Sequence, residues 1–485
     1  MISERFIGDL PLRSAAEASR QINGDDTLLV SGFGSVGYPK AIPLALADDD
    51  HDFSLTVMSG GSVGAEIDID LINANAIDWR FPYQARPPTR KAVNEGNIAF
   101  HDRNLSTLGD ELQYGKLADG DVAVVEALAV GPDWLIPTTS IGQTPAFVEN
   151  ADRLVVEVNT TVPDTIREFH DIYRPGCPPN REPIPLTKPG GRIGDARITF
   201  DPEKLRAVVE TDRRDQPYEF RDATEDDLAI AENLRVFLET EVKHSPIFEN
   251  SLRIQFGVGS LGNALMGALG DAELGDRDLI YYGEVIQDGL LDLLDEGNLA
   301  AASATSLALS TEGQDRLFDH VERYAEDVVL RPTNLSNSPT LIDRFGVIAV
   351  NSALEVDLFG HVNSTHVDGT DVMNGVGGSC DFTHHSPLAV FALPSTAADG
   401  EISRIVPMVP HVDHTEHEID VVVTEQGVAD LRGTTPRETA EALIENCAHP
   451  DYRDDLTDYL DRGRRRGGYI PHHLETALDW HTNRL

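Results

Sequence analysis

Cysteine is scarce in this chain, and its scarcity excludes two kinds of small stabilised fold. The three cysteines are widely spaced and odd in number: Cys177, Cys380 and Cys447. They form neither a disulfide framework nor a zinc-binding pair of the C-x-x-C kind. Long apolar runs are also missing, since no stretch of about 18 apolar residues occurs that would span a membrane.

A secretory signal is absent from the first residues. They contain no basic segment followed by an apolar stretch, and they read Met1-Ile2-Ser3-Glu4-Arg5-Phe6. Because neither a signal nor a spanning segment is found, we expect a cytoplasmic protein.

Lysine is rare as well. The chain has six lysines and 33 arginines. With 82 acidic residues, its formal net charge is −43. Such a charge opposes nucleic-acid binding, because contact with phosphates needs cationic groups that displace counterions. An acidic, lysine-poor globular protein is typical of concentrated salt, where the Debye length falls to about 3 Å at 1 M and self-repulsion is screened. We therefore predict a salt-loving host, and we expect neither nucleic acid nor a membrane as a partner.

The chain does contain β-branched runs that alternate with helical stretches, and this alternation predicts an α/β fold. With 485 residues it exceeds one ordinary hydrophobic core, so we expect two domains. In the first half the predicted strands are residues 27–30, 53–58, 121–126 and 153–158. Glycine turns follow several of them, such as the turn at Gly32 and Gly34 before a helix that starts near Pro39. This order favours mostly parallel sheets that bind ligands at the carboxyl ends of their strands.

A proline-rich segment separates the two halves. Residues 159–218 lose periodicity and hold six prolines between Pro175 and Pro189, which predicts a long ordered loop or a linker. A helix is expected at residues 225–242, with strands at 252–256, 279–282, 346–351, 388–393 and 418–423. We therefore predict two similar open α/β domains with mostly parallel sheets, residues 1–222 (including the loop) and residues 223–485.

Glu284 is the most informative residue, because it follows the apolar run at residues 279–282 and precedes a helical segment at residues 290–294. A carboxylate that leaves a buried strand is poorly hydrated and held by rigid backbone, as a nucleophile requires. The alternative is that Glu284 caps the helix, since acidic residues favour helix N-termini. Glu425 follows the strand at residues 418–423 in the same way, and two such glutamates are harder to explain as caps.

Two glycine clusters are candidate ligand-binding turns. The first, Gly257-Val258-Gly259-Ser260-Leu261-Gly262, fits G-x-G-x-x-G between a strand and a helix, where backbone N–H groups approach a phosphate or an oxyanion. A dinucleotide fold would also need an acid at the end of the next strand, and Asp276 and Asp278 precede that strand instead. A plain tight turn therefore stays an equal alternative.

The second cluster is Asn374-Gly375-Val376-Gly377-Gly378-Ser379. Its backbone suits an N–H donor for an oxyanion, although flexible turns explain most such clusters. Cys380 follows directly, but no histidine partner can be assigned to it from the sequence, which disfavours a cysteine nucleophile.

His411, His414 and His417 are spaced like metal ligands. The i, i+3, i+6 spacing, however, does not bring three rings to one face of a strand, and on a helix they would drift by about 60° per step. A hydrogen-bonded loop is the favoured interpretation, and we predict no metal site.

Several longer segments point to one family. They are residues 31–34, 37–43, 136–140, 184–189 and 284–288, and most specifically residues 359–366, 409–417 and 430–433. These segments resemble the acetyl-CoA hydrolase/acetate CoA-transferase family, of which succinyl-CoA:acetate CoA-transferases are members. The resemblance covers nearly the whole chain, and contiguous matches of this length are far more specific than a glycine pattern.

The resemblance implies roles for individual residues. Glu284 matches the family's nucleophilic glutamate, Glu425 resembles a second active-site glutamate, and Asn337 is similar to the amide that positions the acyl group. Gly378, with Gly377 beside it, resembles the backbone oxyanion donor. The residues that match the loop against the CoA thioester are Gly257, Val258, Gly259 and Ser260. One departure is Cys380, where the family commonly has glycine.

The implied activity is transfer of CoA between small acids such as acetate, propionate and succinate. Its expected mechanism is ping-pong, through a glutamyl-CoA thioester. Coenzyme A is then a substrate, and neither a permanent cofactor nor a metal is expected. Acetyl-CoA hydrolysis at the same site is the nearest alternative, and a non-catalytic CoA-binding protein is a more remote one. The family also implies a homodimer, and an active site between the two domains.

Overall fold

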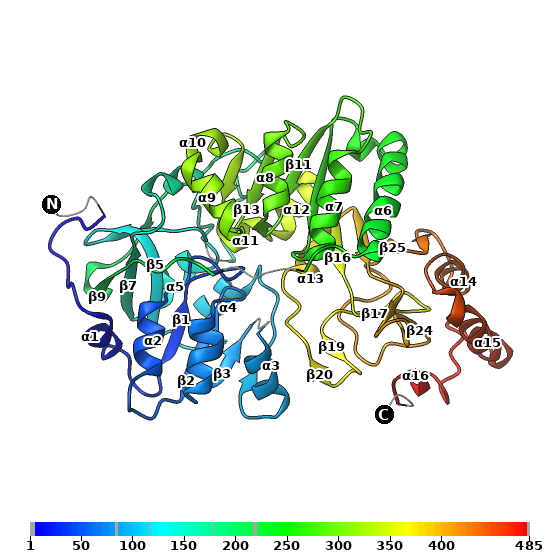
Figure 1. The fold of residues 1–485 in the computed structure, drawn as a ribbon, viewed down its shortest axis with the longest axis horizontal. Coiled ribbons are helices and arrows are strands. Elements are labelled where there is room, and N and C mark those ends of the chain that lie inside the picture. Colours follow the sequence, from blue (N-terminus) through cyan, green and yellow to red (C-terminus); the bar gives the residue numbers. More distant parts are fainter. Residues whose placement is uncertain (1–4, 83–85, 116, 177, 217–220, 483–485) are drawn as a thin grey trace. The chain divides into compact units, whose positions relative to one another are not determined.

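The computed structural model describes residues 5–82, 86–115, 117–176, 178–216 and 221–482 (Figure 1). The chain forms two compact units, each made of two stretches of sequence. The first unit comprises residues 1–219 and 281–341, and the second comprises residues 220–280 and 342–485. The expectations that concern residues 1–4, Cys177 and the end of the predicted loop at 217–218 lie outside the described residues.

This division differs from the two contiguous domains that we predicted. The chain changes units close to residue 222, as expected, but it returns to the first unit for residues 281–341. Glu284 therefore belongs to the first unit. Hydrogen bonds attach the returning segment to the rest of the first unit. Ile141 N–H donates to the Thr305 carbonyl at 2.9 Å, and Leu307 N–H donates to the Thr139 carbonyl at 3.0 Å.

A large sheet forms the centre of the first unit. Its strands are β1 (Thr27–Val30), β2 (Leu55–Ser59), β3 (Ile77–Phe81), β4 (Ala99–Phe100), β5 (Val122–Val130), β6 (Trp134–Pro137), β7 (Arg153–Asn159), β8 (Ile198–Thr199) and β9 (Leu205–Thr211). Parallel pairing joins β4-β3-β2-β1-β5-β7-β9, whereas β6 pairs antiparallel with β5 and β8. The predicted mostly parallel sheet is confirmed.

Helices pack against this sheet through the apolar side chains of its strands. The α-helices are α1 (Ala15–Ser19), α2 (Ala41–Ala47), α3 (Pro87–Asn94), α4 (Leu108–Gln113) and α5 (Thr144–Asn150). They are accompanied by the π-helix η1 (Glu66–Leu71) and the 3-10 helices η2 (Asp164–Phe169) and η3 (Pro202–Lys204). Ile42 and Leu46 of α2 pack in one core with Leu28 and Val57 of the sheet. All nine residues of β5 are buried, as expected of a central strand covered on both faces.

The loop predicted at residues 159–218 contains more structure than its prolines indicate. Strand β9 lies inside it and pairs in parallel with β7. The sequence Leu205-Arg206-Ala207-Val208-Val209-Glu210-Thr211 has the β-branched character of a strand. The prediction was wrong there because the proline-rich part obscured a short strand, which hydrogen bonds to β7 and to Pro11 and Arg13 hold in the sheet.

The returning segment of the first unit adds small elements around Glu284. They are β12 (Val285–Ile286), α8 (Asp288–Asp295), β13 (Ala301–Ala304), β14 (Ser306–Leu307), α9 (Thr311–Asp319), α10 (Val321–Tyr324), β15 (Val328–Leu330) and α11 (Thr333–Ser336). β12 pairs in parallel with β14, and β13 pairs in parallel with β15. Two elements cross the unit boundary, β11 (Asp278–Tyr282) and α12 (Pro339–Phe345).

The second unit contains a run of parallel strands in the order β10, β16, β21 and β25, with β26 antiparallel at the end. They are β10 (Ser251–Phe256), β16 (Ile348–Ser352), β21 (Leu388–Ala392), β25 (Val421–Thr424) and β26 (Gly427–Asp430). The shorter strands are β17 (Glu355–Asp357), β18 (Val362–Asn363), β19 (His366–Val367), β20 (Asp371–Val372), β22 (Thr396–Ala397), β23 (Ile402–Ser403) and β24 (Ile405–Val406).

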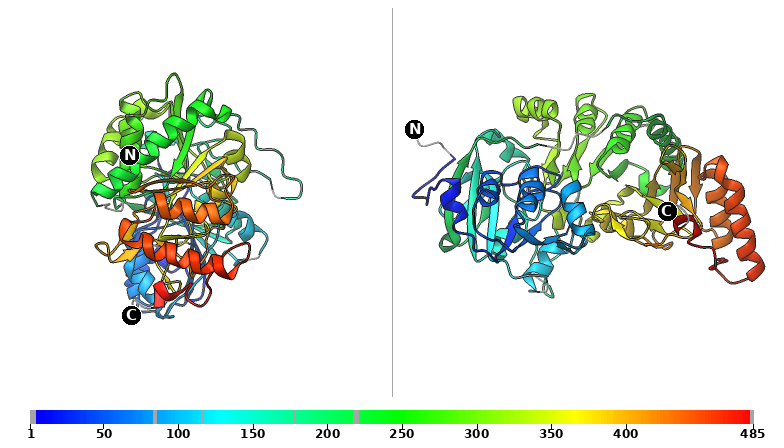
Figure 2. Two further views of the ribbon diagram at one scale, coloured as in Figure 1. Left: turned by 90° about the vertical axis from the view of Figure 1, so that its right-hand side faces the viewer. Right: turned by 60° about the horizontal axis from the view of Figure 1, so that its bottom comes forward.

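The helices of the second unit are α6 (Glu225–His244), η4 (Pro246–Phe248), α7 (Ser260–Gly270), α13 (Ser379–His385), α14 (Pro436–Asn446), α15 (Pro450–Arg466) and α16 (Asp479–Thr482). Helices α14 and α15 lie side by side (Figure 2) and share a core with β25 through Leu443, Leu456 and Val422. Cys447 is buried in that core, and burial raises the pKa of its thiol to about 12. Among the described residues, no helix is both long and apolar enough to cross a lipid bilayer.

Candidate active site

Glu284 lies in the turn between β11 and β12 and is partly buried. Its backbone is held by two residues of the segment that follows β13. The Glu284 carbonyl accepts Thr305 N–H at 2.8 Å and Ser306 N–H at 3.2 Å, and the neighbouring Gly283 N–H donates to the Ser303 carbonyl at 3.0 Å. The carboxylate therefore stands on rigid backbone, as the sequence predicted.

Glu284 does not cap the helix that follows it. The N-cap of α8 is Gln287, and the acidic residue in the first turn of α8 is Asp288. The carboxylate of Asp288 accepts Ser310 N–H at 2.9 Å and the Ser310 hydroxyl at 2.7 Å. The capping interpretation of Glu284 is therefore wrong.

Asn337 contacts the Glu284 carboxylate directly. Its Nδ2 donates to Glu284 Oε1 at 2.8 Å, and the Asn337 side chain is fully buried. The other end of the amide is also occupied, because the Ser336 hydroxyl donates to Asn337 Oδ1 at 2.7 Å. A buried amide with both ends bonded has one orientation available, so it presents an N–H group to the carboxylate.

Arg331 is a buried cation that the sequence did not single out. Its side chain is fully buried and forms an ion pair with Asp171. Its Nε donates to the Ser303 hydroxyl at 2.9 Å and one NH2 donor reaches the Pro189 carbonyl at 2.9 Å. Arg331 therefore ties the end of β13, beside Glu284, to the proline-rich segment. Its partners lie 28 to 160 residues away along the chain, so no local pattern predicts them.

His170 links the same proline-rich segment to the strand end at Thr138. Its Nε2 lies 3.0 Å from the Thr138 carbonyl. Burial lowers the pKa of His170 to about 4, so at neutral pH the ring is neutral and Nε2 carries the proton that it donates.

Acid is expected to weaken this part of the first unit through His170. Its pKa falls from about 6.5 in the unfolded chain to about 4 in the folded protein, so its contribution to stability is present above pH 6.5 and is lost as the pH falls towards 4. The difference corresponds to about 3 kcal/mol of unfolding free energy. Thermal unfolding of His170→Gln, which keeps a donor, should depend less on pH across this window than unfolding of the unaltered protein. Equal slopes would contradict the assignment.

The turn predicted to lie against CoA joins β10 to α7 in the second unit. Gly259 is the N-cap of α7 with a φ of 133°, a conformation that only glycine adopts readily. Gly257 and Val258 line a small hollow together with Asn351 and Ser352 at the end of β16, and Ser260 begins α7. The turn thus exposes backbone at the carboxyl ends of two parallel strands.

Gly377 and Gly378 precede α13, and Gly378 is its N-cap. Gly377 has a φ of 61°, whereas Gly378 has a φ of −94°. Cys380 lies in the first turn of α13, where its Sγ is 3.9 Å from both the Asp413 carbonyl and His414 Nδ1. The residue that departs from the family pattern is thus part of a regular helix.

Glu425 stands in the hairpin between β25 and β26, so it follows a buried strand as predicted. Its carboxylate accepts Ser395 N–H at 2.8 Å, the Ser395 hydroxyl, and Gln426 Nε2 at 3.0 Å. These donors fix the position of the carboxylate within the second unit.

The three histidines of residues 411–417 make different contacts. His411 Nε2 lies 3.1 Å from Asp413 Oδ1, His414 Nε2 lies 3.2 Å from the Ser379 hydroxyl, and His417 is exposed. The hydrogen bonds are those expected of an ordered loop. Within the described part of the chain no group of three or more His, Cys, Asp or Glu residues is arranged to hold a metal ion.

The structure therefore brings Glu284 and Asn337 into contact in the first unit. The remaining predicted site residues belong to the second unit: Gly257, Val258, Gly259, Ser260, Gly377, Gly378 and Glu425. The roles of all these residues stay predictions.

Comparison with known proteins identifies the family of this chain. Residues 11–210 match the acetyl-CoA hydrolase/transferase N-terminal domain, and residues 313–460 match the C-terminal domain of the same family. The succinyl-CoA:acetate CoA-transferase of Clostridium kluyveri is 42% identical, over 99% of this chain and 91% of that protein. The propanoyl-CoA:succinate CoA transferase of Escherichia coli is 40% identical, over 97% of this chain and 96% of that protein.

Hydrolases are equally similar. The acetyl-CoA hydrolase of Eremothecium gossypii is 41% identical, over 93% of this chain and 90% of that protein. Among solved structures, the 4-hydroxybutyrate CoA-transferase of Porphyromonas gingivalis has a TM-score of 0.62 at 22% identity, over 94% of this chain and 98% of that one. At 22% identity, the similarity to this solved structure shows a shared fold. The chain belongs to the acetyl-CoA hydrolase/transferase family and is an enzyme of this kind.

Proposed function

We propose that the enzyme transfers CoA from an acyl-CoA to a small carboxylate by a ping-pong mechanism, with Glu284 as the nucleophile. The contact between Asn337 Nδ2 and Glu284 Oε1 at 2.8 Å carries this proposal. It places a fixed N–H donor on an oxygen of the carboxylate that must become a thioester carbonyl.

The reaction begins when a Glu284 carboxylate oxygen adds to the carbonyl carbon of the acyl-CoA. The C–S bond breaks, and an acyl-glutamyl anhydride and CoA thiolate form. The thiolate then adds to the glutamyl carbonyl and expels the first carboxylate, which leaves a glutamyl-CoA thioester. An incoming carboxylate reverses these steps and departs as the new acyl-CoA.

Asn337 acts during attack on the glutamyl carbonyl. Negative charge develops on the carbonyl oxygen as the thiolate adds, and the buried amide is already directed at that oxygen. A donor that is in place before the charge appears stabilises the adduct without reorganisation, and loss of one such donor typically costs 10² to 10³ in rate. We assign the corresponding role at the acyl carbonyl to Gly378 N–H, and the CoA contact to the turn at residues 257–260.

Transfer is favoured over hydrolysis because a covalent glutamyl intermediate conserves the thioester for a second acid. Relatives at about 40% identity include both activities, so similarity alone does not decide between them. The relatives named for acetate, propanoate and succinate support small carboxylates as acceptors. The chain's own residues supply the chemistry, with CoA as a substrate.

Acyl exchange tests this function. Acetyl-CoA incubated with the enzyme and isotopically labelled succinate or acetate should yield labelled acyl-CoA faster than free thiol appears. The reciprocal plots for the two substrates should be parallel, as a ping-pong mechanism requires. Thiol release that is unaffected by added carboxylate would establish a hydrolase instead.

We also propose that the enzyme works in a salt-rich cytoplasm as a homodimer. The net charge of −43 and the six lysines support the first part, because dense acidic charge is tolerated where salt screens it. Homodimers are the expectation from the family resemblance.

A further inference from the structure

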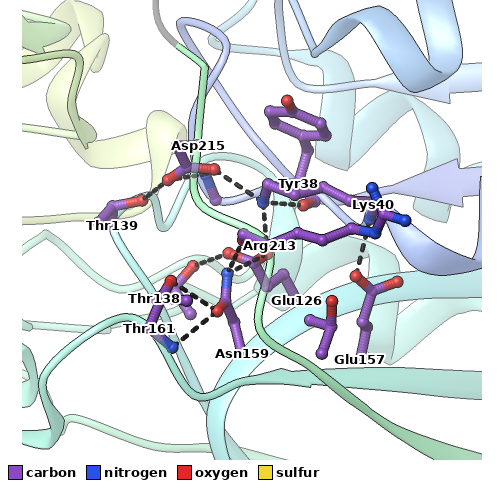
Figure 3. Close-up of polar contacts among 12 residues, drawn as sticks. Tyr38, Lys40, Glu126, Thr138, Thr139, Glu157, Asn159, Thr161, Arg213 and Asp215 are labelled. Atoms are coloured by element: carbon purple, nitrogen blue, oxygen red, sulfur yellow. Dashed lines mark hydrogen bonds and ion pairs between the residues drawn. The ribbon is translucent and has the colours of Figure 1, made fainter. Parts of the chain in front are cut away.

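Lys40 is buried completely in the first unit, inside a cluster of acidic residues (Figure 3). All three donors of its ammonium group are used. They lie 2.5 Å from Glu126 Oε2, 2.8 Å from Asp215 Oδ1 and 2.8 Å from the Tyr38 carbonyl. Burial disfavours the charged form, but Asp215 and Glu126 outweigh it and raise the pKa of Lys40. Lys40 is therefore a cation held in a single position.

The acidic residues of this cluster outnumber the cation. A third carboxylate, Glu157, accepts the backbone N–H groups of Lys40, Ala41 and Ile42 at the start of α2, at 2.9 to 3.1 Å. The backbone N–H groups at the start of α2 thus provide the hydrogen bonds of Glu157, and the Lys40 ammonium group forms ion pairs with Glu126 and Asp215. Burial raises the pKa of Glu126 against the opposing effect of Lys40. Both carboxylates consequently depend on further hydrogen-bond donors.

Glu126 also accepts Asn159 Nδ2 at 3.0 Å and Asp215 also accepts Gly37 N–H at 3.2 Å, and two more donors come from one short segment, Thr138 and Thr139. The Thr138 hydroxyl donates to Glu126 Oε1 at 2.7 Å, and the Thr139 hydroxyl donates to Asp215 Oδ2 at 2.7 Å. Both threonines are buried. Two consecutive hydroxyls therefore anchor the end of β6 to the cluster.

The same segment supports the backbone that carries Glu284. The Thr139 carbonyl accepts Leu307 N–H at 3.0 Å, and Ile141 N–H donates to the Thr305 carbonyl at 2.9 Å. Thr305 N–H in turn donates to the Glu284 carbonyl at 2.8 Å. Hydrogen bonds, joined by the short backbone stretches 139–141 and 305–307, thus connect Asp215 through Thr139 to the turn that bears Glu284.

We propose that the buried cluster of Lys40, Glu126 and Asp215 positions Glu284 for acyl transfer, through Thr138 and Thr139. This proposal rests on the proposed function of Glu284 as the nucleophile. Buried ion pairs are often replaceable by apolar residues without loss of stability, so stability alone does not explain the cluster. A role in holding the nucleophile in place explains the cluster, because displacement of a nucleophile by about 1 Å can lower the rate about 10²-fold. Lys40, Thr138 and Thr139 are positioning residues and touch no substrate.

Thr139→Val tests the connection, because valine keeps the shape of threonine and removes the hydroxyl that reaches Asp215. We expect kcat for acyl transfer to fall about 10- to 100-fold, with little change in KM for the acyl-CoA. The rate at which the glutamyl-CoA thioester forms in a single turnover should fall by the same factor. Thr139→Ser, which restores the hydroxyl, should recover most of both rates.

Thr161→Val is the matched control. The Thr161 hydroxyl donates to Asn159 Oδ1 at 2.8 Å, and Asn159 Nδ2 donates to Glu126 Oε2 at 3.0 Å, so Thr161 reaches the cluster only through Asn159 (Figure 3). This variant removes a threonine hydroxyl hydrogen bond near the cluster and leaves the Thr138 and Thr139 hydrogen bonds in place, so its kcat should stay within about twofold even if its thermal midpoint falls. If Thr139→Val does not fold, Thr139→Ala takes its place.

Two outcomes are distinguishable. A Thr139 variant that forms the thioester at the normal rate, or equal losses in the Thr139 and Thr161 variants, would overturn the positioning role and leave the proposed function intact. Absence of any thioester in the unaltered enzyme would overturn the proposed function, and the positioning proposal with it.

Discussion

Glu284→Gln is expected to lower kcat for acyl transfer by about 10⁴-fold or more, the scale of loss on removal of a covalent nucleophile. Glutamine has the size of glutamate and still offers an oxygen to Asn337 Nδ2, which contacts Glu284 Oε1 at 2.8 Å. Its neutral amide, however, does not attack a thioester. The variant should therefore fold and bind CoA normally but accumulate no glutamyl-CoA thioester. Mass spectrometry of the protein after incubation with acyl-CoA measures this directly.

Two further variants make the Glu284 result specific. Glu296→Gln alters an exposed glutamate just after α8 and should leave kcat within about twofold, since exposed substitutions have small effects. Glu284→Asp keeps the carboxylate but shortens its reach to Asn337, so an intermediate loss is expected. Full activity in Glu284→Gln would reject Glu284 as the covalent nucleophile.

Lys40→Met is expected to destabilise the first unit by about 3–5 kcal/mol, the usual result of removing one partner of a buried ion pair. Methionine fills much of the space of lysine, so the main loss is electrostatic. Glu126 and Asp215, at 2.5 and 2.8 Å from Lys40 Nζ, would remain buried without their cation. The midpoint of denaturant-induced unfolding, followed by circular dichroism, measures the change.

Lys91→Met provides the matched control for Lys40→Met. Lys91 lies on α3 with its side chain 75% exposed, and its nearest acid is Glu95 at 3.8 Å. An exposed pair of this kind contributes at most about 1 kcal/mol, so the unfolding midpoint should hardly change. The double variant Lys40→Met/Glu126→Gln should be more stable than Lys40→Met alone, because it also removes the buried charge of Glu126 that Lys40→Met leaves without its cation. Equal midpoints for the Lys40 and Lys91 variants would show that the buried pair adds nothing.

Local sequence predicted much of the fold because its signals are short in range. The β-branched run at residues 27–30 became β1 with the predicted bounds, and the helix predicted at residues 225–242 became α6 (Glu225–His244). The position of Glu284 after a buried strand was likewise visible in the sequence. Strand β9 was missed although its residues have β-branched character, because it follows the proline-rich segment and its pairing with β7 is not visible in the sequence.

Glu284 and Asn337 lie 53 residues apart in the sequence, and only the family resemblance linked them there. Nothing in the spacing of these two residues indicates that the amide would donate to the carboxylate. The contacts of Lys40 are likewise not indicated by the sequence. Lys40 is one of six lysines in a chain of net charge −43, and its partners Glu126 and Asp215 lie on distant segments.

The sequence by itself determined the α/β class and the family, and it singled out Glu284 as the predicted nucleophile, a role that stays a prediction. Short-range periodicity is enough for the fold class, because it depends on neighbours within a few positions, whereas the family rests on long segments that resemble it. Only the tertiary structure decided that residues 281–341 return to the first unit, and that a fully buried lysine stands behind the segment supporting Glu284. Burial and hydrogen bonding between segments about 80 to 180 residues apart decide such features, as for Lys40 with Glu126 and Asp215 and for Thr139 with Leu307, and these contacts exist only after the chain has folded.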